Sequence, residues 1–230
     1  MFDSEVLLPD LWDILGAVPV TLAMALGIFV FSTIVGSLFA MVEYRRVPLL
    51  RELVVAYKVV FKGVPMVIVI FLAYYGLPPT LQFLTSLVGI DYNGHSTPNW
   101  ITLIVALTAC VAAFQAEVVK GALNSFDNGQ ADAAYSLGYK RSQVFRRVML
   151  PQVIVAAIPD LANSIMVIMK ALSLGFAIEV VDIFAHAQLT AALNFYYLEA
   201  FLIAVVIYMV IAYIVTYAAD RMERALRVWA

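Results

Sequence analysis

Long apolar windows alternate with short charged segments along the whole chain. Residues 151–178 contain only two charged side chains, Asp160 and Lys170. Four further windows contain no Asp, Glu, Lys or Arg: 14–42, 63–90, 92–116 and 200–219. A helix needs about 20 apolar residues to cross roughly 30 Å of hydrocarbon. The pattern therefore predicts an all-α membrane fold with five transmembrane helices, over residues 15–42, 54–77, 100–122, 151–178 and 196–219.

Prolines and aromatic residues support these limits. Pro78-Pro79 is predicted to end the second span, and Pro98 precedes the third. Four aromatic residues fall at span ends, where amphipathic rings favour the headgroup layer: Trp12, Trp100, Tyr196 and Tyr197.

Basic residues predict the orientation of the spans. All but one of the 14 Lys and Arg residues lie in segments 43–62, 117–150 and 221–227. The segments that join the spans at the other end, 78–99 and 179–195, contain none. The positive-inside rule then places the N-terminus outside, the C-terminus inside and the 123–150 loop in the cytoplasm. The acidic start lacks the positive region of a cleavable signal, so we expect the first span to be retained as an anchor.

Composition limits what the chain can do. It has 230 residues, 64% of them hydrophobic, with a mean hydropathy of +0.94. We expect one transmembrane domain over 1–230 and no soluble catalytic domain. The net charge of −2 does not indicate nucleic acid, and the basic clusters are expected to contact anionic lipid. The single cysteine, Cys110, excludes an internal disulfide. His95 and His186 lack neighbouring ligand residues, so we expect no metal and no other cofactor.

The longest polar interruption is the segment 129–151, GQADAAYSLGYKRSQVFRRVMLP. Residues 130–137 have few helix breakers and are predicted to form two helical turns. Gly138 suits the left-handed position that ends a helix. Ser142 is predicted to cap a second helix, which carries an apolar stripe and runs into the next span, where Pro151 is tolerated in the first turn. A short helix, a hinge and a second helix should therefore lie outside the bilayer.

This segment resembles the EAA loop of permeases of ATP-binding-cassette importers, which reads Glu-Ala-Ala, three residues, Gly, nine residues, Ile-x-Leu-Pro. Here it reads Asp132-Ala133-Ala134, Gly138 and Val148-Met149-Leu150-Pro151. Matches elsewhere indicate the polar amino-acid subfamily and cover nearly the whole chain: Phe61-Lys62-Gly63-Val64-Pro65, Tyr74-Tyr75-Gly76-Leu77-Pro78, Glu117 with Gly121, Gly129-Gln130, and Pro159, Asn163 and Lys170. Four departures change side chains at matched positions: Asp132 replaces Glu, Lys62 and Lys120 replace Arg, and Leu172 replaces Thr.

The resemblance implies a permease subunit of an ATP-driven amino-acid importer in the bacterial cytoplasmic membrane. Its partners would be a cytoplasmic ATP-binding subunit, a second permease subunit (identical or paralogous) and an extracytoplasmic substrate-binding protein. ATP hydrolysis would belong to the partner, since the sequence contains no glycine-rich phosphate loop. The residues expected to couple to the ATPase are Gln130, Asp132, Ala133, Ala134, Leu137 and Gly138.

Polar residues in the fourth span are candidates for the substrate path. Asp160, Asn163, Val167 and Lys170 follow the spacing of one helical face, and about 15 Å along the axis separates the first from the last. Each charge therefore needs another span, water or a ligand. Two interpretations of this face stay open. Lys170 attracts a substrate carboxylate, with Asp160 or Glu117 facing an ammonium group, or Lys170 ties spans together through a carbonyl or Glu179. Asn163 is equally consistent with a bridge between helices.

Charged residues near the third span allow a structural interpretation as well. Glu117 is expected to pair with Lys120 or Lys62. Arg51, Lys58 and Lys62 fall near one helical face, where contact with lipid phosphates is the alternative to a role in the path.

Other protein classes fit the sequence less well. HExxH, GxSxG and paired intramembrane aspartates are absent, which argues against an intramembrane enzyme. A secondary transporter would usually be longer and carry inverted repeats. A permease for another small solute remains the alternative within the same class.

Overall fold

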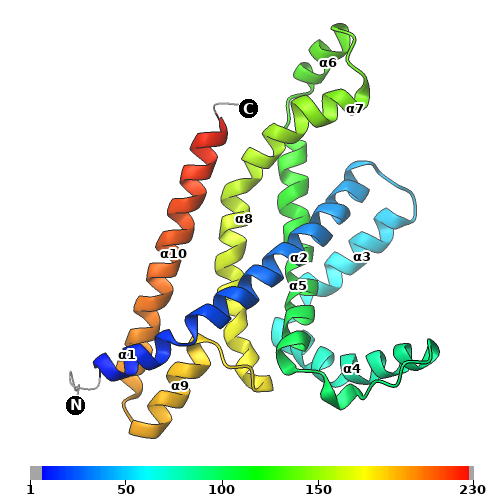
Figure 1. The fold of residues 1–230 in the computed structure, drawn as a ribbon. Coiled ribbons are helices and arrows are strands. Elements are labelled where there is room, and N and C mark those ends of the chain that lie inside the picture. Colours follow the sequence, from blue (N-terminus) through cyan, green and yellow to red (C-terminus); the bar gives the residue numbers. More distant parts are fainter. Residues whose placement is uncertain (1–6, 228–230) are drawn as a thin grey trace.

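The computed structural model describes residues 7–227, and all regular elements in this part of the chain are helices (Figure 1). It holds five stretches that are long and apolar enough to cross a membrane: Leu7–Tyr44, Met66–Leu87, Asn99–Asn124, Arg141–Ile178 and Tyr197–Arg227. The predicted all-α fold with five membrane helices is confirmed.

The first span consists of two helices. α1 (Leu7–Leu15) turns into α2 (Val18–Tyr44), which crosses diagonally over α5 (Asn99–Asn124) and packs along it (Figure 1). Gly36 makes this crossing possible, because a Cβ at this position would lie 2.9 Å from the backbone nitrogen of Ala116. Small residues at helix crossings let membrane helices approach closely.

The second span differs from the prediction over 54–77. α3 (Leu50–Gly63) is a separate helix, and α4 (Met66–Leu87) begins only after Pro65. Val64, which precedes this proline, is extended (φ −89°, ψ 133°), as residues before proline usually are. The helix break therefore falls inside the segment that hydropathy joins to one span.

Pro78-Pro79 lies inside α4, so the predicted end of the span at this pair is wrong. Membrane helices tolerate proline where nearby hydroxyls bond to the backbone. Pro78 and Pro79 lack the N–H groups that would bond to the carbonyls of Tyr74 and Tyr75. Thr80, directly after the pair, adds a hydrogen bond from its hydroxyl to the next carbonyl, that of Gly76, at 2.6 Å. α4 extends to one side of the other spans (Figure 1), and few of its side chains are buried.

The remaining helices form the rest of the bundle. α8 (Leu150–Leu172) packs between α5 and α10 (Tyr197–Arg227), while α9 (Ile183–Asn194) lies at the end where α1 begins. Two 3-10 turns, Gly94–Ser96 and Ser173–Ile178, join the spans at this end. The main apolar core lies where α2, α5, α8, α9 and α10 meet, around the fully buried Ile28, Leu103, Leu107, Ile168 and Leu172.

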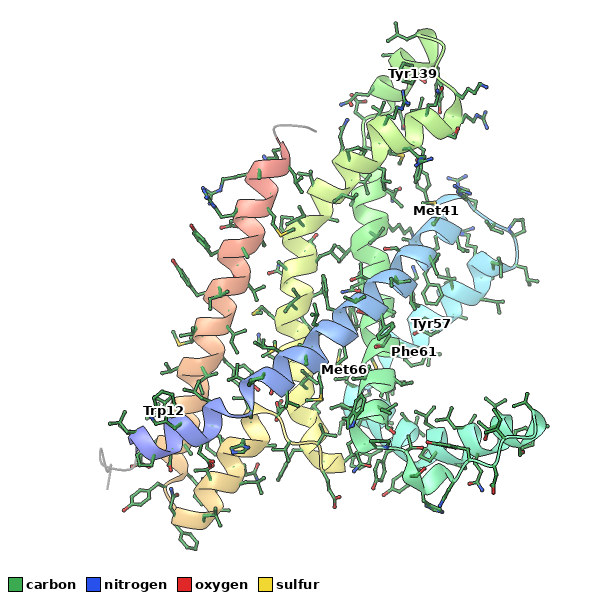
Figure 2. All side chains as sticks on the ribbon, viewed as in Figure 1. Trp12, Met41, Tyr57, Phe61, Met66 and Tyr139 are labelled. Carbon is green, nitrogen blue, oxygen red and sulfur yellow. The ribbon has the colours of Figure 1, made fainter. Side chains whose placement is uncertain are left out.

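α6 (Asn128–Ser136) and α7 (Arg141–Val144) form a hairpin at the opposite end from α1 and α9 (Figure 1). Figure 2 shows Tyr139 at the tip of this hairpin and Trp12 at the other end of the molecule. A π turn, Phe145–Met149, continues α7 into α8, so one helical segment runs from the hairpin into the bundle. The predicted helix, hinge and second helix over residues 130–151 are confirmed.

Candidate functional site

The α6–α7 hairpin, residues 127–149, is built from local capping contacts. Asp127 caps α6 by accepting a hydrogen bond from the backbone N–H of Gly129 at 2.9 Å. At the other end, the N–H of Gly138 donates to the carbonyl of Tyr135 at 2.9 Å, and that of Tyr139 donates to the carbonyl of Ala134 at 3.1 Å. These two bonds form a Schellman motif.

Gly138 has the positive φ that this motif requires, +85°, as the sequence predicts. A residue with a Cβ is strained in this conformation. The second helix begins two residues earlier than expected, since Lys140 and not Ser142 is its N-cap residue. Gln143 secures this start by accepting a hydrogen bond from the Lys140 backbone N–H at 2.8 Å.

The two alanines of the predicted coupling motif lie on different faces of α6. Ala133 is exposed, whereas Ala134 is buried within the hairpin. Sequence reasoning treated both as an open surface, but a helical turn of 3.6 residues places neighbours on different faces. The open face of α6 therefore carries Asp132 and Ala133, followed by Leu137, which is 80% exposed.

Gln130 is part of the hairpin's attachment to the membrane bundle. Its side-chain oxygen accepts a hydrogen bond from the Gln152 amide at 2.6 Å. This contact joins the first turn of α6 to the first turn of α8. α6 is thus tied to α8 by this bond and, by way of α7, by the π turn.

A cluster of charged side chains joins α2, α3 and α5 near the hairpin. Glu43, at the end of α2, contacts the ammonium groups of both Lys58 and Lys120. Lys58 also donates a hydrogen bond to Glu117 Oε1 at 2.9 Å, and Lys62 lies 3.7 Å from the same oxygen. The predicted pairing of Glu117 with a nearby cation is confirmed for Lys62, although its shorter contact is with Lys58.

Lys58 is buried, which corrects the expectation that it faces lipid phosphates. Burial by itself lowers the pKa of Lys58, but hydrogen bonds and charge interactions with Glu43 and Glu117 outweigh burial and raise it above 10.5. The sequence did not predict a role for Glu43, because this residue directly follows an apolar window and its partners lie on other helices.

Aromatic contacts hold α3 against its neighbours beside this cluster. The Tyr57 hydroxyl donates to the carbonyl of Ala109 on α5 at 2.6 Å, and its ring packs on those of Phe39 and Phe61 (Figure 2). Burial raises the pKa of Tyr57 to about 12, so the hydroxyl stays protonated and able to donate. α2, α3 and α5 thus form one connected unit.

The polar face of α8 lies open in the single chain. Asp160, Asn163, Val167 and Lys170 are all exposed. Within the described residues, neither Lys170 nor Glu179 forms an ion pair, so the expected link between them is not present. The Lys170 side chain instead lines a cavity of about 300 Å³ together with Tyr208 and Phe184.

Comparisons with known proteins place the chain in a family. Residues 32–228 match the family described as binding-protein-dependent transport system inner membrane component. The probable amino-acid permease protein YxeN of Bacillus subtilis is 34% identical over 97% of this chain and 96% of its own length. The probable amino-acid ABC transporter permease protein PatM of Vibrio harveyi is 36% identical over 91% of this chain and 88% of its own length.

Solved structures share the fold. The structure of an amino acid ABC transporter with histidines superposes with a TM-score of 0.81 at 21% identity, covering 98% of this chain and 99% of that chain. A chain in an inward-facing structure of the MetNI methionine ABC transporter gives a TM-score of 0.73, also at 21% identity, over 95% of this chain and 98% of that chain. The chain belongs to the family of binding-protein-dependent inner membrane transport components, and it is a multi-pass protein of the bacterial inner membrane.

Proposed function

We propose that this family member is the permease subunit of an ATP-driven amino-acid importer, forming half of the translocation path. The observation that carries the proposal is the α6–α7 hairpin, which presents Asp132, Ala133 and Leu137 beyond the end of the bundle. The amino-acid substrate is supported by the names of the relatives, which include an L-cystine permease protein of Bacillus subtilis at 32% identity.

The proposed orientation places the hairpin in the cytoplasm and the α1–α9 end outside. Lys and Arg gather at the hairpin end, in segments 43–62, 117–150 and 221–227. Positive charge on short loops next to spans marks the cytoplasmic side. A cytoplasmic ATP-binding subunit would then meet the open face of α6, and an extracytoplasmic binding protein would deliver substrate at the other end.

Coupling would pass from the ATPase through α6 into α8. The Schellman motif at Gly138 fixes the angle between α6 and α7, and the Gln130–Gln152 hydrogen bond ties α6 to the start of α8. Closure of the ATPase subunits would move the hairpin as one piece. α8, which carries the polar face, would then change its position in the bundle.

A second permease subunit, identical or paralogous, would complete the path. Asp160, Asn163 and Lys170 lie exposed on one face of α8, and leaving two charges in contact with lipid is costly. Apposition of this face with its counterpart in the second subunit would remove it from lipid. Lys170 would attract the substrate carboxylate there, and Asp160 would face the ammonium group. Glu117 is less suited to that role, because Lys58 and Lys62 already neutralise it.

The test is reconstitution of the permease with its co-purifying subunits in liposomes. We expect uptake of a labelled amino acid that requires the binding protein and internal ATP and is stopped by vanadate. Uptake driven by an ion gradient without ATP would identify a secondary transporter instead. If only sugars or inorganic ions are transported, the chain is still a permease subunit, but the assignment of an amino acid as its substrate is wrong.

A further inference from the structure

A basic cavity of about 790 Å³ lies between the hairpin and the end of α2. Three arginines from two parts of the fold line it: Arg45 directly after α2, Arg141 at the start of α7 and Arg146 in the π turn. Within the described residues, none of these guanidinium groups forms an ion pair or a side-chain hydrogen bond. One carboxylate, Asp132, shares the cavity, so its lining has an excess of positive charge.

Four residues with neutral hydrogen-bonding side chains also line this cavity: Tyr44, Asn128, Tyr135 and Ser142. Apolar residues complete the lining: Phe126, Ala131, Val144, Phe145 and Met149. Guanidinium groups donate several hydrogen bonds in a planar fork that matches phosphate oxygens. The cavity therefore has the chemistry of a site for a phosphate ester.

An apolar groove of about 630 Å³ lies beside the basic cavity and runs into the bundle. α2 lines it with Phe29, Thr33, Ser37 and Met41, one residue in every four, and the same stripe continues to Arg45 in the cavity. From Phe29 to Met41 this stripe rises about 18 Å along the helix axis. The opposite walls are α8 and the second half of α10, both parts of membrane spans.

Phe145, the first residue of the π turn, borders both the cavity and the groove. The same turn directs Arg146 and Met149 to the cavity, while Leu150 lines the groove. π turns add one residue to a helical turn and often mark functional sites. One amphipathic site thus combines a basic cavity at the end of the bundle with an apolar groove at hydrocarbon depth.

We propose that one anionic phospholipid binds here, with its phosphate between Arg45, Arg141 and Arg146 and an acyl chain in the groove. The lipid comes from the leaflet next to the hairpin, which is the cytoplasmic one under the proposed orientation. Basic pockets between membrane helices on that side are suited to anionic headgroups. The phosphate links α2 to the hairpin, so the lipid holds the coupling segment against the bundle.

The test measures lipid binding by the full chain purified with its native partner subunits. Native mass spectrometry follows titration with dioleoylphosphatidylglycerol or dioleoylphosphatidylethanolamine. We expect the anionic lipid to bind preferentially, and Arg45→Gln/Arg146→Gln to weaken its binding by about 10- to 30-fold. Arg221→Gln/Arg224→Gln removes the same amount of charge at the hairpin end of the molecule but outside the cavity. This variant should leave lipid binding unchanged.

A second pair of variants tests the groove without altering charge. Ala218 is exposed and lines the groove, so Ala218→Trp should fill it and weaken binding of the anionic lipid. Ala225→Trp, about two helical turns further along α10 and absent from the groove lining, is the matched control. Glycerol 3-phosphate, which lacks acyl chains, should not displace the lipid.

Four results would overturn the proposal. They are equal binding of the two lipids by the unmodified protein, unchanged binding in the arginine variant, unchanged binding in Ala218→Trp, and displacement by glycerol 3-phosphate. Binding by the isolated chain but not by the complex would also overturn it, because a partner subunit would then occupy the groove. Size-exclusion elution of each variant checks that the protein remains assembled.

Discussion

The ammonium group of Lys58 lies 2.9 Å from Glu117 Oε1 and also contacts the carboxylate of Glu43, so a single side chain on α3 joins α2 to α5. Glu43 and Lys58 are almost fully buried, with side chains 3% and 7% exposed. Removal of one partner from a buried ion pair leaves an uncompensated charge. The cluster is therefore expected to matter more for stability than any ion pair on the surface.

Lys58→Met should lower the free energy of unfolding by about 3 kcal/mol, because Glu43 loses one of its two cations inside the protein. Thermal unfolding of the purified protein in detergent measures the change. Arg51→Met, on the same helix with an exposed side chain, should cost less than about 1 kcal/mol. Glu43→Gln/Lys58→Met should recover part of the loss. If Lys58→Met and Arg51→Met lower the free energy of unfolding equally, the buried cluster contributes no more to stability than a surface ion pair.

Gly138→Val should abolish uptake while the protein still inserts into the membrane. Valine at φ +85° is strained by about 1–2 kcal/mol, so the Schellman motif opens and α6 loses its angle to α7. Gly138→Asn is the matched control, since asparagine adopts this conformation more readily. Uptake and co-purification of the ATPase subunit are measured together. Normal uptake in the valine variant would show that transport does not require a fixed angle between α6 and α7.

The two alanines of α6 should respond differently to tryptophan. Ala133→Trp changes the open face and should block association with the ATPase without altering the thermal stability of the chain. Ala134→Trp forces bulk into the hairpin and should lower stability as well. Co-purification and thermal unfolding separate the effects. If Ala133→Trp still binds the ATPase with unchanged affinity, the docking face lies elsewhere.

Asp182 should make the protein less stable as pH rises from acidic to neutral values. Burial raises its pKa above 3.8, so the folded state disfavours the ionised carboxylate. The penalty is absent below pH 3.8, where the group is protonated in both states, and it is complete above the folded-state pKa. Asp182→Asn keeps the acceptor for the Ala185 N–H and removes the titration. The difference in unfolding temperature between the two proteins should therefore grow in favour of the variant as pH rises. A difference that does not change with pH would contradict this.

The sequence predicted the features that depend on local composition. Four charge-free windows and a fifth with only two charges predicted five spans, and the spacing from Asp132 to Gly138 predicted the helix, the positive φ and the hairpin. Features that depend on contacts between distant helices were not predicted. Glu43 on α2 meets Lys58 on α3 and Lys120 on α5, contacts that depend on how the three helices pack.

The errors in the sequence reading have specific physical causes. Apolar residues continue across Val64-Pro65, so hydropathy merges α3 with the following span although the backbone extends there. A Pro-Pro pair usually ends a helix in a soluble protein, but membrane helices tolerate proline better, and α4 continues through Pro78-Pro79. Asp182 belongs to the segment 179–195, which hydropathy places between two spans, yet it is fully buried as the cap of α9.

The orientation of the protein in the membrane can be measured with single cysteines placed in a Cys110→Ala background. Cysteine at Asp91, which is exposed at the α9 end, should react with an impermeant thiol reagent added outside intact cells. Cysteine at Lys140, in the hairpin, should react only after the cells are permeabilised. Labelling of Lys140→Cys from outside would reverse the orientation and remove the hairpin from the ATPase.

The most direct measurement is photo-cross-linking from two leucines at opposite ends of the helix bundle. Leu137 in the hairpin is 80% exposed, and Leu193 on α9 is 86% exposed. A photoreactive residue at position 137 should cross-link to the ATP-binding subunit in the native complex, and one at position 193 should not. An intact, transporting complex in which position 137 never captures that subunit would contradict coupling through the hairpin.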